Sequence, residues 1–204
     1  MAWVRAVRVA SVGLATAIAA CGSPLLPTDE IVVATRAPAS PAALASPSLA
    51  KGAAQALRYD ESLLEILPAE LDGLPVTSAP EAAADIGSDP DLVRAGERLA
   101  LGLVVDPAGE LAVAAVIALR PGVFSEAFWR DWRDSYDAGA CAQAGGGRGN
   151  AEATMGGRLV HIGTCEGGAR TYHVRLEGRN VLVSITAIGD VRRLGEQLVR
   201  GLRP

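Results

Sequence analysis

Apolar and polar residues alternate most clearly between Arg158 and Ile188, where three runs follow one another: RLVHIGTC, ARTYHVRL and NVLVSITAI. Each run is rich in Val, Ile, Thr and Tyr and is bounded by glycine-containing turns, a pattern typical of β-strands in hairpins. The Gly156-Gly157 pair is a strong two-residue turn, which adds the preceding AEATM as a further strand. The sequence therefore predicts a C-terminal meander of four antiparallel strands.

The turns of this meander also predict the register of its strands, and hence which side chains lie opposite one another. Turns centred on Gly156-Gly157, Gly167 and Gly178-Arg179 keep one face of the meander apolar. On the other face, the same register predicts a row of four polar residues, one from each strand: Glu152, His161, His173 and Ser184.

This polar row is the candidate site. Neighbouring strands lie about 4.8 Å apart, so two opposed imidazoles can reach one metal ion, with Glu152 as a third ligand or orienting partner. A serine beside a histidine also suggests the nucleophile of a hydrolase. However, the solvent face of an antiparallel sheet is expected to be polar for solubility alone. We therefore expect a solvated face here and keep the metal-dependent or serine hydrolase as the alternative.

Upstream of the meander, the pattern predicts two short helices, an edge strand in DGLPVTS, and a hairpin. Asp60 and the Asp89-Pro90 pair are helix caps. The second helix is expected to place one set of side chains on a single face: Leu92, Val93, Gly96, Leu99 and Ala100. The hairpin turns at Asp106-Pro107-Ala108-Gly109. Its second strand, ELAVAAVIAL, is rich enough in alanine that a helix is the competing prediction.

A longer helix, SEAFWRDWRDSYDAG, is predicted to begin after the cap Ser125. Its aromatic residues recur every four positions and are expected in the core: Phe124, Phe128, Trp132 and Tyr136. Trp129 lies off this stripe and is expected to be exposed. A C-terminal helix from Asp190 is expected to face the sheet with a further apolar set: Val191, Leu194, Leu198, Val199 and Leu202.

Together these elements predict one α+β domain over residues 58–204. In this domain an antiparallel sheet, with the four-strand meander at its C-terminal end, carries the aromatic-striped helix and the C-terminal helix packed on one face. A single core is what a domain of this length is expected to form.

The N-terminus has the pattern of an export signal. Two arginines precede the run VASVGLATAIAA, which is too short for a transmembrane helix and typical of a signal peptide. The run ends in Ile18-Ala19-Ala20-Cys21-Gly22, which resembles the lipobox of bacterial lipoproteins. This resemblance covers only the first two dozen residues. It implies that residues 1–20 are removed and that Cys21 is acylated, which would hold the protein on a membrane.

Residues 21–57 are dominated by Pro, Ala, Ser and Thr and have few large apolar side chains. Such a composition cannot bury enough surface to offset the entropy of ordering, so we expect a disordered tether. The chain has three cysteines. If Cys21 is acylated, Cys141 and Cys165 remain to form a disulfide in the oxidising compartment beyond the membrane. An ordinary secretory peptide, leaving Cys21 as a free thiol, is the alternative.

Composition and motifs narrow the function further. The net charge is −4 and aromatic residues make up 4% of the chain, which disfavours nucleic acid as a partner. HExxH, GxSxG, CxxC and Walker motifs are absent from the sequence, and no cofactor is implied. We therefore expect a lipid-anchored extracytoplasmic domain of the cell envelope with a non-catalytic binding or structural role, whose protein or small-molecule partner the sequence does not identify.

Overall fold

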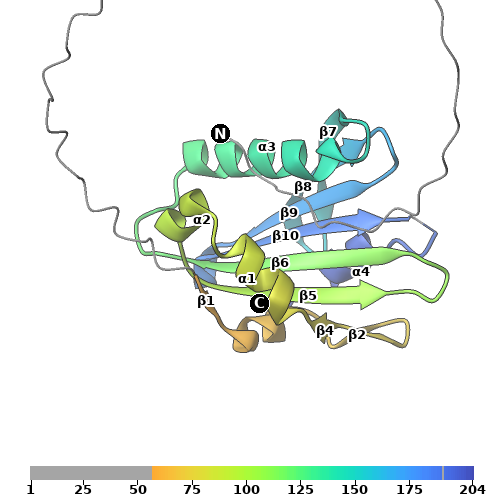
Figure 1. Ribbon diagram of the computed structural model, residues 1–204, viewed down its shortest axis with the longest axis horizontal. Helices are drawn as coiled ribbons and strands as arrows, with labels where there is room; N and C mark the ends of the chain where they lie inside the picture. The colour runs from red at the N-terminus through yellow and green to blue at the C-terminus, as the bar shows by residue number, and fades with distance from the viewer. Residues whose placement is uncertain (1–56, 190) are drawn as a thin grey trace, which may run out of the picture. The chain divides into compact units, whose positions relative to one another are not determined.

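The computed structural model describes residues 57–189 and 191–204 (Figure 1). The predicted signal peptide, Cys21 and the predicted tether up to residue 56 lie outside the described residues. The described chain forms an eight-stranded sheet in the order β1-β5-β6-β10-β9-β8-β7, with β4 also paired to β5. The strands of this sheet are β1 (Arg58–Tyr59), β4 (Thr77–Ser78), β5 (Gly96–Val105), β6 (Leu111–Leu119), β7 (Gly147–Met155), β8 (Arg158–Cys165), β9 (Arg170–Leu176) and β10 (Val181–Ile188).

Within the described residues, short elements and four α-helices surround this sheet. A separate small hairpin is made of β2 (Glu70–Leu71) and β3 (Leu74–Pro75), and two 3-10 helices are η1 (Glu61–Ile66) and η2 (Glu177–Arg179). The α-helices are α1 (Pro80–Ile86), α2 (Pro90–Ala95), α3 (Glu126–Ala142) and α4 (Leu194–Arg200). No helix in the part of the chain that the structure describes is long and apolar enough to cross a membrane.

The register predicted for the meander is confirmed at every step. Glu152 pairs with His161, His161 with His173, and His173 with Ser184. The last turn is longer than the predicted two residues, because η2 and the left-handed Asn180 form it. It keeps the same register, since it takes one residue from each of the two strands.

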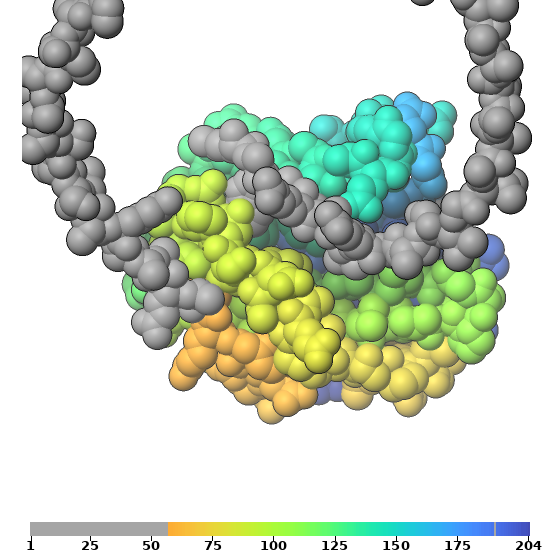
Figure 2. Space-filling view, viewed as in Figure 1, coloured from red at the N-terminus to blue at the C-terminus, as the bar shows by residue number. Residues whose placement is uncertain are grey.

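The α+β class, the predominantly antiparallel sheet and both predicted helices are confirmed, but the two helices do not share a face of the sheet. On one face, α4 packs on Tyr172, and Gly195 is needed there because a side chain would collide with the ring. On the other face, Trp132 of α3 packs in a core cluster with Leu182 and with residues of α1 and α2. Figure 2 shows α1 and α2, in yellow to yellow-green, in front of the sheet on the near side.

Several local predictions upstream of the meander also need correction. Asp60 caps η1 as expected, and residues 111–119 form a strand rather than a helix. In contrast, α2 ends at Ala95, because Gly96 adopts an extended conformation and begins β5. Leu99 therefore lies in a strand and not on a helix, and α1 was not predicted.

The buried residues of the C-terminal helix were predicted correctly in most cases. Leu194, Leu198, Val199 and Leu202 are buried as predicted. The prediction that Val191 is buried is wrong, since this residue precedes α4 and is 93% exposed. The aromatic stripe of α3 belongs to the core cluster on its face of the sheet, with Trp132 as its buried member.

Candidate functional site

The polar row lies beneath α3 and not on a solvated face. His173 and Ser184 are 0% exposed and His161 is 8% exposed, whereas the side chain of Glu152 remains mostly open to solvent. The expectation of a solvated face is therefore wrong for the three inner residues. The physical reason is that the aromatic helix packs on the side of the meander that carries the row.

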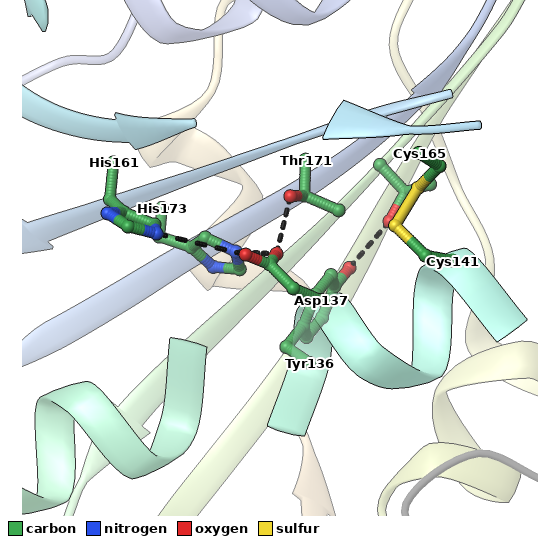
Figure 3. Close-up of a disulfide and its surroundings, with 8 residues drawn as sticks. Tyr136, Asp137, Cys141, His161, Cys165, Thr171 and His173 are labelled. Atoms are coloured by element: carbon green, nitrogen blue, oxygen red, sulfur yellow. Dashed lines mark hydrogen bonds and ion pairs between the residues drawn. A yellow bond between two sulfur atoms is a disulfide. The ribbon is translucent and has the colours of Figure 1, made fainter. Parts of the chain in front are cut away.

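Asp137 of α3 is the centre of the interactions that the row makes (Figure 3). Its Oδ1 lies 2.8 Å from Nε2 of His173 and also accepts a hydrogen bond from the Thr171 hydroxyl. Strand β8 carries Gly163 beside this carboxylate, and any side chain at Gly163 would collide with Asp137. The glycine thus gives the helix room to place a carboxylate directly on the sheet.

The other end of the His173 ring contacts Ser184, whose Oγ lies 2.9 Å from Nδ1. Nε1 of Trp132 donates to the same oxygen, also at 2.9 Å. Because an indole can only donate, one arrangement of protons satisfies every atom. Trp132 donates to Ser184, the Ser184 hydroxyl donates to Nδ1 of His173, and Nε2–H of His173 donates to Asp137.

The pKa of Asp137 is lowered by its partners. Burial by itself would raise it, but the hydrogen bonds that Asp137 accepts from His173 and from the Thr171 hydroxyl outweigh that effect. Asp137 is therefore a carboxylate at neutral pH, which is the form that accepts the hydrogen bonds of both partners.

His161 has a different environment from His173. Nη1 of Arg133 lies 3.0 Å from its Nδ1, and because guanidinium only donates, Nδ1 is the acceptor and the ring proton is on Nε2. This Nε2 lies 3.8 Å from Oδ2 of Asp137 and has no hydrogen-bond partner within the described residues. Burial, followed by the charge of Arg133, lowers the pKa of His161 despite Asp137 and Glu152. His161 is therefore neutral at pH 7.

These pKa shifts predict that acid destabilises the fold. The ordinary pKa of His161 is 6.5 and that of Asp137 is 3.8, and both are lowered in the folded chain. The unfolded chain therefore takes up protons first, so the stabilisation is complete above pH 6.5 and is lost as pH falls through the folded values. Between pH 7.5 and 5, the melting temperature of the parent should fall more steeply than that of His161→Gln. Parallel slopes for the two proteins would contradict this assignment of His161.

The geometry gives little support to either chemical hypothesis. Among the residues that the structure describes, no group of three His, Cys, Asp or Glu side chains is placed to hold a metal ion. Asp137, His173 and Ser184 do resemble a hydrolase triad in their residue types. However, Ser184 is fully enclosed and its oxygen already accepts from Trp132, so a substrate could not reach it. The arrangement is that of a buried hydrogen-bond network that holds α3 on the sheet.

The predicted disulfide is present in the structure. Cys141 and Cys165 are bonded, with their Cα atoms 5.1 Å apart, and both are buried with Ala169. The bond joins the last turn of α3 to the end of β8, one helical turn beyond Asp137 (Figure 3). It therefore links α3, the helix that covers the row, covalently to the sheet.

Sequence reasoning missed the residues of α3 that bind the row, chiefly Asp137 and Arg133. The signal was available, because a second set recurs every four residues beside the aromatic stripe: Trp129, Arg133, Asp137 and Cys141. Trp129 belongs to this set and is half-buried, with its ring edge-on to His173 at 6.3 Å between centroids. The prediction that Trp129 is exposed is therefore wrong.

An open groove borders the network on the side of the N-terminal half of α3. It has a volume of about 290 Å³ and is lined by residues of α3 and by the outer ends of β7, β8 and β9, including Trp129, Arg133, Glu152 and His161. Comparison with protein-family models, with curated proteins and with solved structures finds no match to this chain.

Proposed function

We propose that the protein is a lipid-anchored extracytoplasmic domain with a non-catalytic binding or structural role. One observation carries the non-catalytic part of this proposal. Ser184 and His173, the residues of the row best suited to catalysis, are fully buried and hold α3 through Trp132 and Asp137. Their polar groups are thus already used for stability, and the surface left for function is the groove beside them.

Two further features support the location. The Ile18-Ala19-Ala20-Cys21 stretch resembles a lipobox and follows an export signal. The Cys141–Cys165 disulfide is of the kind that persists in oxidising compartments outside the cytosol. A domain tethered to a membrane surface through Cys21 fits both observations.

Replacing the anchor residue tests this proposal. In cells that carry a prolipoprotein diacylglyceryl transferase, we expect the parent chain to fractionate with membranes and Cys21→Ser to move to the soluble fraction. A single acyl chain binds a membrane only weakly, whereas the several chains of a lipoprotein anchor it stably, so the shift should be nearly complete.

Ser23→Ala, two residues along, is the matched control and should fractionate as the parent does. Membrane association of Cys21→Ser equal to that of the parent would overturn the anchor. The serine or metal-dependent hydrolase remains the alternative, but no observation on the described residues favours it over the binding role.

A further inference from the structure

The groove beside α3 continues into a second hollow. The second hollow has a volume of about 270 Å³, and the two share Arg158, Arg175 and Glu177 as lining residues. Arg158 is committed to structure, because its guanidinium donates to the backbone oxygens of Gly156 and Leu202. Arg133 is partly committed as well, because its Nη1 donates to Nδ1 of His161, whereas Arg175 forms ion pairs with Glu126 and Glu177 at the rim of the groove.

Both of these arginines lie over aromatic rings, Arg175 in contact and Arg133 at cation–π distance. The guanidinium carbon of Arg175 lies 3.0 Å from the centroid of the Phe124 ring, and that of Arg133 lies 5.5 Å from the centroid of Trp129. Stacking fixes the plane of a guanidinium and leaves the N–H donors on its edges available for in-plane partners. The two side chains are 28% and 14% exposed, so they form part of the groove wall and do not extend into solvent.

Their carboxylate neighbours form ion pairs with them that are longer than an optimal charge-assisted hydrogen bond. Nη1 of Arg175 lies 3.3 Å from Glu177 and 3.9 Å from Glu126, and Nη1 of Arg133 lies 3.6 Å from Glu152. A charge-assisted hydrogen bond measures about 2.7–2.9 Å. These glutamates are at least half exposed at the groove rim, whereas Nε of Arg133 is buried and has no hydrogen-bond partner in the described part of the chain.

We propose that this groove binds a small organic anion, a carboxylate or a phosphate monoester that carries a short apolar group. The anionic oxygens would accept from the guanidinium edge of Arg175, displacing the loosely held glutamates, in the bidentate geometry that arginine favours. The apolar group would lie on Leu159, which is 66% exposed within the groove. A volume of about 290 Å³ is near the lower limit for ligand pockets, which restricts the ligand to a few carbons.

This inference rests on the proposed binding role and names the class of ligand. Its test uses the full-length chain with Cys21→Ser, which lacks the lipid and retains the groove. Hexanoate and hexyl phosphate are titrated while the indole N–H resonances of Trp129 and Trp132 are followed by NMR. We expect a saturable shift of Trp129 and little change at Trp132, which is bonded to Ser184 beneath the helix. Binding of one anion alone identifies the preferred head group and supports the proposal.

Arg175→Ala and Leu159→Asp should each weaken binding at least tenfold, the first by removing the cation and the second by placing a like charge in the groove. Arg94→Ala is the matched control, because Arg94 is an exposed arginine of α2 and does not line the groove. An unchanged Trp132 resonance shows that each variant is folded. The proposal is overturned if neither anion gives a saturable shift, if hexanol binds equally well, or if both variants bind as the parent does. Membrane fractionation through Cys21 is measured separately, so failure here leaves the proposed anchor intact.

Discussion

Asp137→Ala should lower the free energy of unfolding by about 3 kcal/mol. The substitution removes the acceptor of both His173 and Thr171, which are 0% exposed and cannot turn to water instead. A buried polar group left without its partner costs about 1–3 kcal/mol, and two groups are affected. For a domain of this size, the melting temperature should fall by about 6–12 °C. Urea denaturation followed by circular dichroism measures the change.

Asp134→Ala is the control for this experiment, because Asp134 is exposed on the same helix one turn earlier. A surface substitution of this kind should change stability by no more than about 0.5 kcal/mol. If Asp137→Ala has an effect as small as that of Asp134→Ala, the buried network does not stabilise the fold.

Removing the disulfide, by Cys141→Ser together with Cys165→Ser, should lower the free energy of unfolding by about 3 kcal/mol. The bond closes a loop with a sequence separation of 24 residues, and the chain entropy it removes from the unfolded state gives an effect of this size. The measurement is the urea midpoint of the parent with and without reductant, compared with that of the double variant. Reduction should bring the parent to the stability of the variant. A parent whose midpoint ignores reductant, or one purified without reductant that carries two free thiols, would contradict the disulfide.

The meander was predictable from the sequence because neighbouring residues along the chain determine its turns and its register. Gly156-Gly157 is a two-residue turn, and the alternation of Val, Ile and Tyr with polar residues permits only one register on each side of it. A slip of one residue would place the apolar set on the wrong face. The pairing of His161 with His173 followed from the same alternation together with a turn centred on Gly167.

The environment of the row was not predictable in the same way. A polar face of a sheet is expected to be exposed to solvent. Whether α3 covers this face depends on a helix more than ten residues away along the chain. Asp137 is polar as well, so the contact between two polar surfaces gives no hydrophobic signal to either. Once the helix is in place, His173 and Thr171 bond to Asp137 and Ser184 accepts from Trp132, and this complementarity is visible only in three dimensions.

The misplaced boundary between α2 and β5 has a similar cause. Leu99 and Ala100 continue the helical spacing of Leu92, so periodicity alone extends the helix. In the structure they pair with β6, where Leu99 lies opposite Ile117. Pairing with a distant strand outweighs the local preference for helix, and Gly96 provides the residue at which the chain changes conformation.

Labelling with a fluorophosphonate tests most directly whether the row of His173 and Ser184 is a closed network or an active site. Such reagents form a covalent adduct with an activated serine, and peptide mass spectrometry identifies the residue modified. Because Ser184 is fully buried and accepts from Trp132, the folded chain should yield an unmodified peptide containing Ser184. An adduct on Ser184 that disappears in His173→Ala would contradict the non-catalytic account and establish the hydrolase.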